Sequence, residues 1–183
     1  MGLASIKEFI FPQEVYIAIL EHGKRKINQE YLPGEYQEPK AYGLIGGSIN
    51  GEQVEVVGTY VLTKNQRGSQ DQKAQMDKNM KEYAVPSETP MEKRGWIADP
   101  EEVWEAISQF SEQSGSLVGN YHTHRIAWEH DPERDTCTKI DRELAKNSGQ
   151  WVFILSVVNP GRPILRAFYE GQNKKEALIT IKK

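Results

Sequence analysis

The stretch "AYGLIGGSINGEQVEVVGTYVLTKN" (residues 41–65) contains two apolar runs on either side of "GSINGE". Asn50-Gly51 is a strong signal for a two-residue hairpin turn, so the two runs are predicted to pair as antiparallel strands. Both runs are almost continuously apolar around their glycines. This pattern is typical of strands that are covered on both faces.

Helices and strands are predicted to alternate along the rest of the chain. Residues 13–30 have apolar positions at helical spacing, with Pro12 just before the first turn. Asp99 and Pro100 are typical of an N-cap and a first helical residue, and they predict a second helix. A short helix is expected in "TKIDRELAKNSG" (138–149). Further strands are predicted over residues 117–124, 151–158, 164–169 and, as an edge strand, 176–183.

This alternation predicts an α/β (α+β) fold with a mixed central β-sheet flanked by helices. The 183 residues are enough for one domain with a proper core and too few for two, so residues 1–183 are expected to form a single domain. Residues 64–95 are highly polar and are expected to form an insertion, with a short helix at 70–83.

Composition narrows the class of function. The formal net charge is −3, from 23 basic and 26 acidic side chains, and no basic stripe with interleaved aromatics argues for nucleic acid. The longest apolar run, "WVFILSVV" (151–158), is far shorter than the roughly 20 residues of a membrane span, and the N-terminus lacks the apolar region of a signal peptide. The only cysteine, Cys137, suits a reducing compartment. We therefore expect a cytoplasmic protein with neither membrane nor nucleic-acid partners.

The run "GSLVGNYHTHRIAWEHDPERDTCTKID" (115–141) contains three of the four histidines. His122 and His124 lie two residues apart in a predicted strand, so their side chains share a face, about 6.6–6.8 Å apart along the backbone. Two imidazoles at that spacing can converge on a zinc ion, which also needs a third protein ligand and keeps one position for water. His130 and His22 have simpler interpretations, as a solvated loop residue and a packed helix residue.

The third ligand has two candidates. Asp141 lies in the first turn of the predicted helix, three residues after Thr138, whereas Asp135 lies inside the loop that follows His124. A helix start is a rigid platform, and this one immediately precedes the strand at 151. We therefore favour Asp141 over Asp135.

"VGNYHTH", followed by a hydroxyl residue and Asp141 at a helix start, resembles the JAB1/MPN/Mov34 metalloenzymes, the JAMM proteases. "AYGLIGG" (41–47) is similar to the family's "GLLxG" strand, "VEVVGTYVL" to its hairpin partner and "WVFILSVVNPGRPILRAFY" to its closing strands. Residues 13–170 follow the family's order of elements. The resemblance implies an MPN/JAMM-like (cytidine-deaminase-like) architecture.

In that family a glutamate precedes a His-x-His pair and a Ser-x-x-Asp. The resemblance therefore implies that His122, His124 and Asp141 bind zinc, and that Thr138 stands where the family has a serine that stabilises the oxyanion. Zinc then activates a water that attacks an amide carbonyl. The implied substrate is a peptide or the flexible tail of a ubiquitin-like protein, bound beside a sheet edge by strand addition.

Three features depart from the family pattern. Arg125 replaces the proline that usually follows the second histidine, and sixteen residues separate His124 from Asp141, a longer loop than is common. At the shorter spacing Asp135 would be the ligand, but Pro132 would then fall where a hydroxyl is needed.

The third departure concerns the catalytic base. Lys40 occupies the position of the family's catalytic glutamate, and a lysine cannot take the proton of the attacking water as a carboxylate does. Glu38 is the nearest substitute and Glu35 a more distant one. The sequence thus predicts a zinc metallopeptidase or isopeptidase with Glu38 and Thr138 as catalytic residues. The alternative is a catalytically inactive MPN-like binding or scaffold domain.

Overall fold

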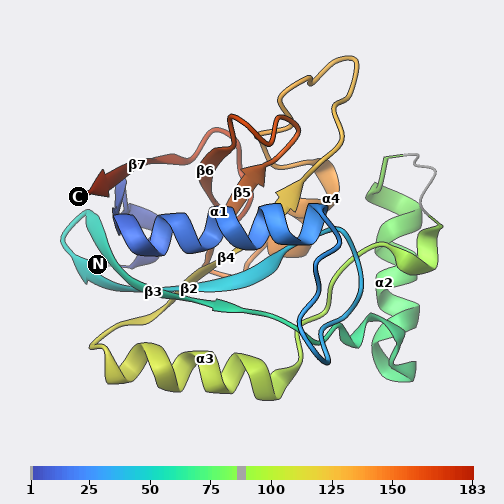
Figure 1. The fold of residues 1–183 in the computed structure, drawn as a ribbon, viewed down its shortest axis with the longest axis horizontal. Helices are drawn as coiled ribbons and strands as arrows, with labels where there is room; N and C mark the ends of the chain where they lie inside the picture. Colours follow the sequence, from blue (N-terminus) through green and yellow to red (C-terminus); the bar gives the residue numbers. More distant parts are fainter. Residues whose placement is uncertain (1, 86–89) are drawn as a thin grey trace.

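The computed structural model of the chain describes residues 2–85 and 90–183. In these residues the strands form a closed barrel in the order β1-β3-β2-β4-β5-β6-β7, with helices packed around and into it (Figure 1). The strands are β1 (Glu8–Pro12), β2 (Tyr42–Asn50), β3 (Gln53–Val61), β4 (Ser116–His124), β5 (Trp151–Ser156), β6 (Ile164–Tyr169) and β7 (Glu176–Lys182). The α-helices are α1 (Gln13–Ile27), α2 (Gln70–Tyr83), α3 (Pro100–Glu112) and α4 (Lys139–Ala145), and the short 3-10 helices are η1 (Leu3–Ser5), η2 (Gln66–Gly68) and η3 (Met91–Lys93).

The prediction of a mixed central sheet flanked by helices, of the MPN/JAMM-like kind, was wrong, because the sheet closes into a barrel. Closure depends on β1, a strand that the sequence pattern did not indicate. β1 pairs in parallel with β3 on one side, Phe9 opposite Val54, and in parallel with β7 on the other, Phe9 opposite Ile179. The tail predicted as an edge strand therefore pairs on both sides, with β6 and with β1.

The predicted hairpin is present. β2 and β3 pair antiparallel, with Asn50 opposite Gln53, so Gly51 and Glu52 form the turn, one residue later than the Asn50-Gly51 signal suggested. Gly51 has a φ of +62°, which glycine adopts at little cost.

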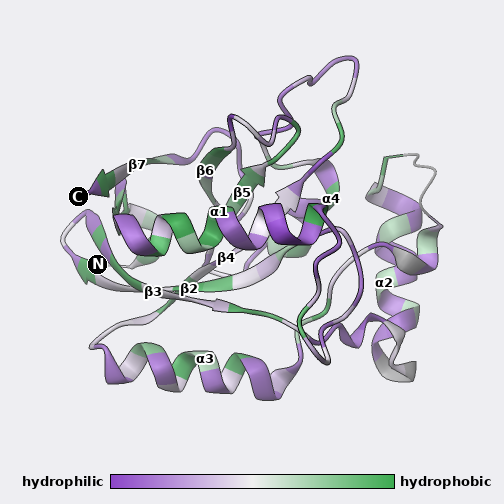
Figure 2. Cartoon of the chain, in the orientation of Figure 1, coloured by the Kyte–Doolittle hydropathy of each residue, from purple (hydrophilic) through white to green (hydrophobic). Residues whose placement is uncertain are grey.

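The prediction of burial on both faces is confirmed for β2, which is buried from Gly43 to Gly47, but was wrong for β3, where exposed Gln53 and Glu55 alternate with buried Val54 and Val56. In β2, successive side chains face opposite sides of the sheet. Ile45 faces the main core, where Phe9 and Phe153 pack edge to face with ring centroids 4.8 Å apart and where α1 contributes Ile19. Leu44 faces the opposite side, where it meets Phe110 of α3. Figure 2 shows the apolar strands between these helices, whereas α2 is largely hydrophilic.

Glycines in β2 make room for aromatic rings. A Cβ atom at Gly46 would lie 2.2 Å from Cγ of Phe110, and one at Gly43 would lie 2.2 Å from the ring of Tyr121. Both distances are far below van der Waals contact, so the "GLIGG" run is required by packing and not only by strand formation.

Gly46→Ala is therefore expected to destabilise the protein by about 1–3 kcal/mol through overpacking against Phe110. Urea unfolding measures this difference. Gly68→Ala is the matched control, because a Cβ atom there meets nothing within 4 Å. Equal stability of the two variants would contradict the packing argument.

The predicted insertion at residues 64–95 folds partly as expected, and its residues 86–89 lie outside the described part. The predicted helix at 70–83 is confirmed as α2. Arg67, whose side chain is buried, pairs with Asp77 of α2 and donates from Nε to the carbonyl oxygen of Arg94, 2.9 Å away. These contacts join α2 to the segments at residues 67 and 94. α2 also lies next to α4, at the end of the barrel where β4 finishes (Figure 1).

Other elements match their predicted positions. α3 begins after Asp99, whose side chain accepts hydrogen bonds from the N–H groups of Glu101 and Glu102. α1 ends at Ile27, three residues earlier than predicted. No helix in the described ranges has both the length and the apolar character needed to cross a membrane.

Candidate metal centre

Three potential ligands meet where β4 ends and α4 begins. The Nε2 atoms of His122 and His124 are 3.2 Å apart. Oδ1 of Asp141 lies 3.3 Å from Nε2 of His122, and its Oδ2 lies 3.4 Å from Nε2 of His124. The three side chains are mostly buried. Among the described residues this is the group of histidine, cysteine and acidic side chains that is close enough to hold a metal ion.

These distances fit a tetrahedral ion. Ligands about 2.0–2.1 Å from zinc, placed at tetrahedral angles, lie about 3.3–3.4 Å from one another. The two Nε2 atoms are 3.2 Å apart, and each lies 3.3–3.4 Å from a different oxygen of Asp141, so each of these three separations is close to that value. Two imidazoles and one carboxylate also match a common ligand set of catalytic zinc, which leaves the fourth position for water or substrate.

His124 is held in the orientation that metal binding needs. Its Nδ1 lies 2.9 Å from the carbonyl oxygen of Arg134, to which it donates a hydrogen bond. With the proton on Nδ1, the lone pair of Nε2 faces His122 and Asp141. Arg134 has a φ of +48°, a left-handed backbone conformation that is uncommon for a residue with a side chain.

Asp141 is positioned by the start of α4. Thr138 is the N-cap of this helix and forms a capping box with Asp141. The backbone N–H and the hydroxyl of Thr138 both donate to Oδ2 of Asp141, at 2.7 Å each. A hydroxyl has one proton, so in this arrangement Thr138 orients the carboxylate and has no proton left for an oxyanion.

The ionisation states suit metal binding. Burial opposes the charge of Asp141, but the neighbouring imidazoles, His122 first, hold the pKa of its carboxyl well below the usual value. Burial lowers the pKa of His124, with Asp141 acting in the opposite direction. At neutral pH Asp141 is therefore a carboxylate and His124 a neutral imidazole, which are the forms that bind metals.

The structure brings together the three predicted ligands and keeps the alternative apart. Oδ2 of Asp135 lies 3.1 Å from Nη1 of Arg166, in an ion pair outside the cluster. His130 is exposed and stacks on Trp128, and His22 is a buried residue of α1. Their positions agree with the non-ligand interpretations, while ligand binding by His122, His124 and Asp141 stays a prediction.

A cleft of about 850 Å³ opens over these three side chains. Aromatic rings form one wall: Tyr42 stacks on Trp96, with centroids 4.6 Å apart, and on the ring of His122, at 5.8 Å. The insertion contributes Met80, from α2, to another wall. The basic residues that line the cleft are Lys40, Arg94, Arg125 and Arg134.

The predicted base, Glu38, is close to this cleft but is not one of its lining residues, whereas Lys40 is. Glu38 is buried, and its Oε1 has no hydrogen-bond partner among the described residues. Burial raises the pKa of Glu38 to about 7, although Lys40, Lys26 and Arg125 oppose the rise. Such a carboxyl can both accept and release a proton near neutral pH.

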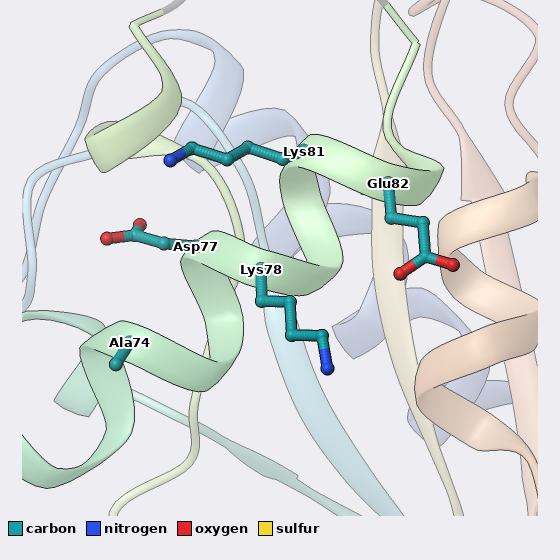
Figure 3. Close-up of a pocket in the computed structure, with 5 residues that line it drawn as sticks. All are labelled: Ala74, Asp77, Lys78, Lys81 and Glu82. Carbon is teal, nitrogen blue, oxygen red and sulfur yellow. The ribbon is translucent and has the colours of Figure 1, made fainter.

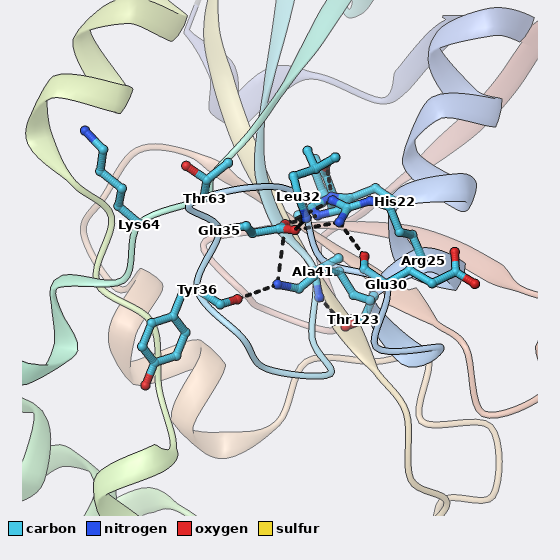
Figure 4. A network of polar contacts seen from close by, with 12 residues as sticks. His22, Arg25, Glu30, Leu32, Glu35, Tyr36, Ala41, Thr63, Lys64 and Thr123 are labelled. Carbon is cyan, nitrogen blue, oxygen red and sulfur yellow. Dashed lines mark hydrogen bonds and ion pairs between the residues drawn. The ribbon is translucent and has the colours of Figure 1, made fainter.

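Glu35, the more distant candidate base, is fully engaged elsewhere (Figure 4). Arg25 binds both of its carboxylate oxygens, at 2.5 and 3.0 Å, and the N–H of Leu32 donates to Oε2 at 2.8 Å. Nζ of Lys26 lies 3.4 Å from Oε1. Nδ1 of the neighbouring His22 is hydrogen-bonded to the hydroxyl of Tyr121, at 2.8 Å. Glu35 thus serves the core and has no free oxygen for catalysis.

A second hollow lies along α2 (Figure 3). Its lining residues all come from that one helix, and Figure 3 shows their side chains pointing in different directions. Ala74 is apolar, and the charged side chains are mainly exposed. This surface contains no converging set of polar groups, so the cleft over His122 is the stronger candidate site.

Sequence reasoning missed the residues that the barrel brings in from a distance. Tyr42 and Trp96 form a cleft wall from separate segments, and the carbonyl of Arg134 orients His124. For the third predicted ligand, Asp141, the capping-box pattern with Thr138 three residues earlier was a usable sequence signal. No comparable local signal marked Tyr42, Trp96 or Arg134.

No protein-family model and no curated protein matches the chain. Among solved structures, the fold is similar to the solution structure of protein DSY2949 from Desulfitobacterium hafniense, a structural-genomics target. The two chains are 19% identical and superpose with a TM-score of 0.59, and the match covers 96% of this chain and 93% of the other. At this identity the likeness concerns the fold alone.

Proposed function

We propose that the protein is a zinc-dependent metallopeptidase or isopeptidase that uses His122, His124 and Asp141 as metal ligands. The observation that carries the proposal is the set of separations of 3.2–3.4 Å among the two histidine Nε2 atoms and the carboxylate oxygens of Asp141. Zinc, when bound, supplies a Lewis acid that makes water nucleophilic near neutral pH and polarises a carbonyl. The similarity of "VGNYHTH" and its downstream Asp141 to the JAMM proteases supports the same reaction.

The chain's own groups supply orientation and proton transfer. Thr138 orients Asp141, and the carbonyl of Arg134 orients His124. Such groups matter because a misplaced ligand weakens both metal binding and catalysis. Glu38 takes the proton of the attacking water and returns it to the leaving amine, a task that suits its pKa of about 7. Tyr42 and Trp96 cover one side of the site and limit access of bulk water.

The implied substrate is a peptide segment, such as the flexible tail of a ubiquitin-like protein. The cleft, of about 850 Å³, is large enough for several side chains, and its wall of aromatic rings suits an extended peptide. The single cysteine favours a reducing compartment, and we place the enzyme in the cytoplasm.

Glu38→Gln tests this function. With zinc-loaded protein and a ubiquitin-like protein that carries an amide-linked fluorophore at its C-terminus, we expect kcat/KM to fall about a hundredfold, because the proton acceptor is removed. Bound zinc stays stoichiometric. Glu21→Gln, on the exposed face of α1, is the matched control and keeps full activity.

The thermal stability of the same variant tests the burial of the Glu38 carboxyl independently of turnover. The folded-state pKa of Glu38 is raised from 4.5 to about 7, so its favourable contribution is complete below pH 4.5 and is lost as the pH rises through 7. Glu38→Gln should therefore unfold at a higher temperature than the unmodified protein at pH 8. Unchanged turnover in Glu38→Gln would remove Glu38 from the mechanism.

A second function has one observation in its favour. Lys40 lines the cleft where the JAMM pattern has its glutamate, and Glu38 does not line it. A catalytically inactive binding or scaffold domain is therefore the alternative. Stoichiometric zinc, no turnover of the probe and no effect of His122→Ala on partner binding would favour that alternative.

A further inference from the structure

Basic side chains are concentrated around the candidate metal centre. Lys40, Arg94, Arg125 and Arg134 line the same cleft as His122, whereas Asp141 supplies the only carboxylate among its lining residues. As a proposed metal ligand, Asp141 is engaged with the metal and does not neutralise these four basic side chains. Bound zinc would add further positive charge to the same space.

Two of these cations, Lys40 and Arg125, are half-buried and lack an acidic partner in the part of the chain that the structure describes. In the described ranges, no carboxylate oxygen lies within 4 Å of the side-chain nitrogens of Lys40 or Arg125. The buried Nε of Arg125 has no hydrogen-bond partner there either. The charge of Glu38 influences the pKa of Lys40, but Glu38 forms no ion pair with either residue. Burial of an unpaired polar group is costly unless a ligand completes it.

Elsewhere in the described ranges, buried and half-buried cations are paired with carboxylates. Arg25 and Lys26 share Glu35, Arg67 pairs with Asp77, and Arg166 pairs with both Asp135 and Glu176. Among the described residues, the buried or half-buried cations without an acidic partner therefore all line the cleft. This coincidence indicates that the missing negative charge comes from the ligand.

We propose that the substrate presents a carboxylate to Lys40 and Arg125, beside the metal centre. The inference rests on the proposed function, because it assigns to that cleft a peptide with an acidic group next to the scissile bond. Arg125 suits this role, since a guanidinium binds both oxygens of a carboxylate. The group comes either from the free C-terminus of the peptide or from an aspartate or glutamate side chain.

Three short peptides distinguish these sources. They are N-acetyl-trialanine acid, its C-terminal amide, and N-acetyl-Ala-Ala-Asp amide. Binding is measured on metal-free, ¹⁵N-labelled protein by chemical-shift titration, so that a carboxylate cannot bind to zinc. We expect at least one acidic peptide to bind on the order of ten times more tightly than the neutral amide, as a charge-assisted hydrogen bond provides.

Lys40→Gln and Arg125→Gln should each remove this preference, whereas Lys24→Gln, on the exposed surface of α1, should keep it. Preference for the trialanine acid alone identifies a C-terminal carboxylate, and preference for the aspartyl amide alone identifies a side chain. Equal binding of all three peptides, or a preference that survives in both cleft variants, overturns the proposal. Since the titration uses neither zinc nor turnover, its failure is distinguishable from failure of the peptidase assignment.

Discussion

Asp141→Ala is expected to abolish stoichiometric zinc binding, whereas Asp135→Ala is expected to retain it. The carboxylate of Asp141 lies 3.3 and 3.4 Å from the two histidine Nε2 atoms, and that of Asp135 is paired with Arg166. Loss of an outer residue that orients a ligand costs roughly 10–100-fold in metal affinity, so loss of a ligand itself should cost more. Competition with a chromogenic chelator measures the two affinities.

The comparison is well controlled, because both variants remove an aspartate from neighbouring segments of the chain. Thermal unfolding without metal establishes that each variant folds. Hydrolysis of the fluorophore-tagged probe should follow zinc content and disappear in Asp141→Ala. The reverse pattern, with zinc lost in Asp135→Ala and kept in Asp141→Ala, would show that the wrong carboxylate was assigned.

The elements that were predictable carry their signal within a few residues. The β2–β3 hairpin, the Asp99 cap of α3 and the helix at 70–83 all come from local patterns, and local patterns found them. Closure of the barrel has no such signal. β1 is five residues long and ends at Pro12, and it is stabilised by partners as remote as Leu178, which is opposite Glu8. A parallel pairing of that kind needs no turn motif between its strands, so the sequence pattern indicated an open sheet.

The candidate site likewise contains residues that local patterns indicated and residues whose roles depend on distant parts of the chain. The period of two in a strand placed His122 and His124 on one face, and the helix start singled out Asp141. The buried acid network was not foreseeable, because Glu35 acquires its role only when the loop after α1 folds back onto that helix. The pairing of Asp135 with Arg166 likewise depends on strand β6, which follows in the chain. Contacts between distant segments decided which of the acidic residues remained available.

Glu35→Gln is expected to lower the free energy of unfolding by about 3–5 kcal/mol, because removing one partner of a buried ion pair leaves the others uncompensated. The side chain of Glu35 has no exposed surface, and it accepts from Arg25 at 2.5 and 3.0 Å with Lys26 at 3.4 Å. Glutamine keeps the shape but not the charge, so the buried Lys26 and the half-buried Arg25 would be left without a counter-ion. Urea unfolding at pH 7 measures the change, with the exposed Glu30→Gln as the matched control.

The pH dependence of stability separates charge from packing in this variant. Burial would raise the pKa of Glu35, but the hydrogen bonds from Arg25 and Leu32 and the charge of Lys26 outweigh it and lower the pKa from 4.5 to about 2. The stabilising contribution of Glu35 is therefore complete above pH 4.5 and is lost as the pH falls toward 2. Burial also lowers the pKa of His22 from 6.5 to about 4, which adds an earlier decline between those values. The unmodified protein should lose its advantage over Glu35→Gln between pH 4.5 and 2, and a constant difference across that range would contradict the ionic role of Glu35.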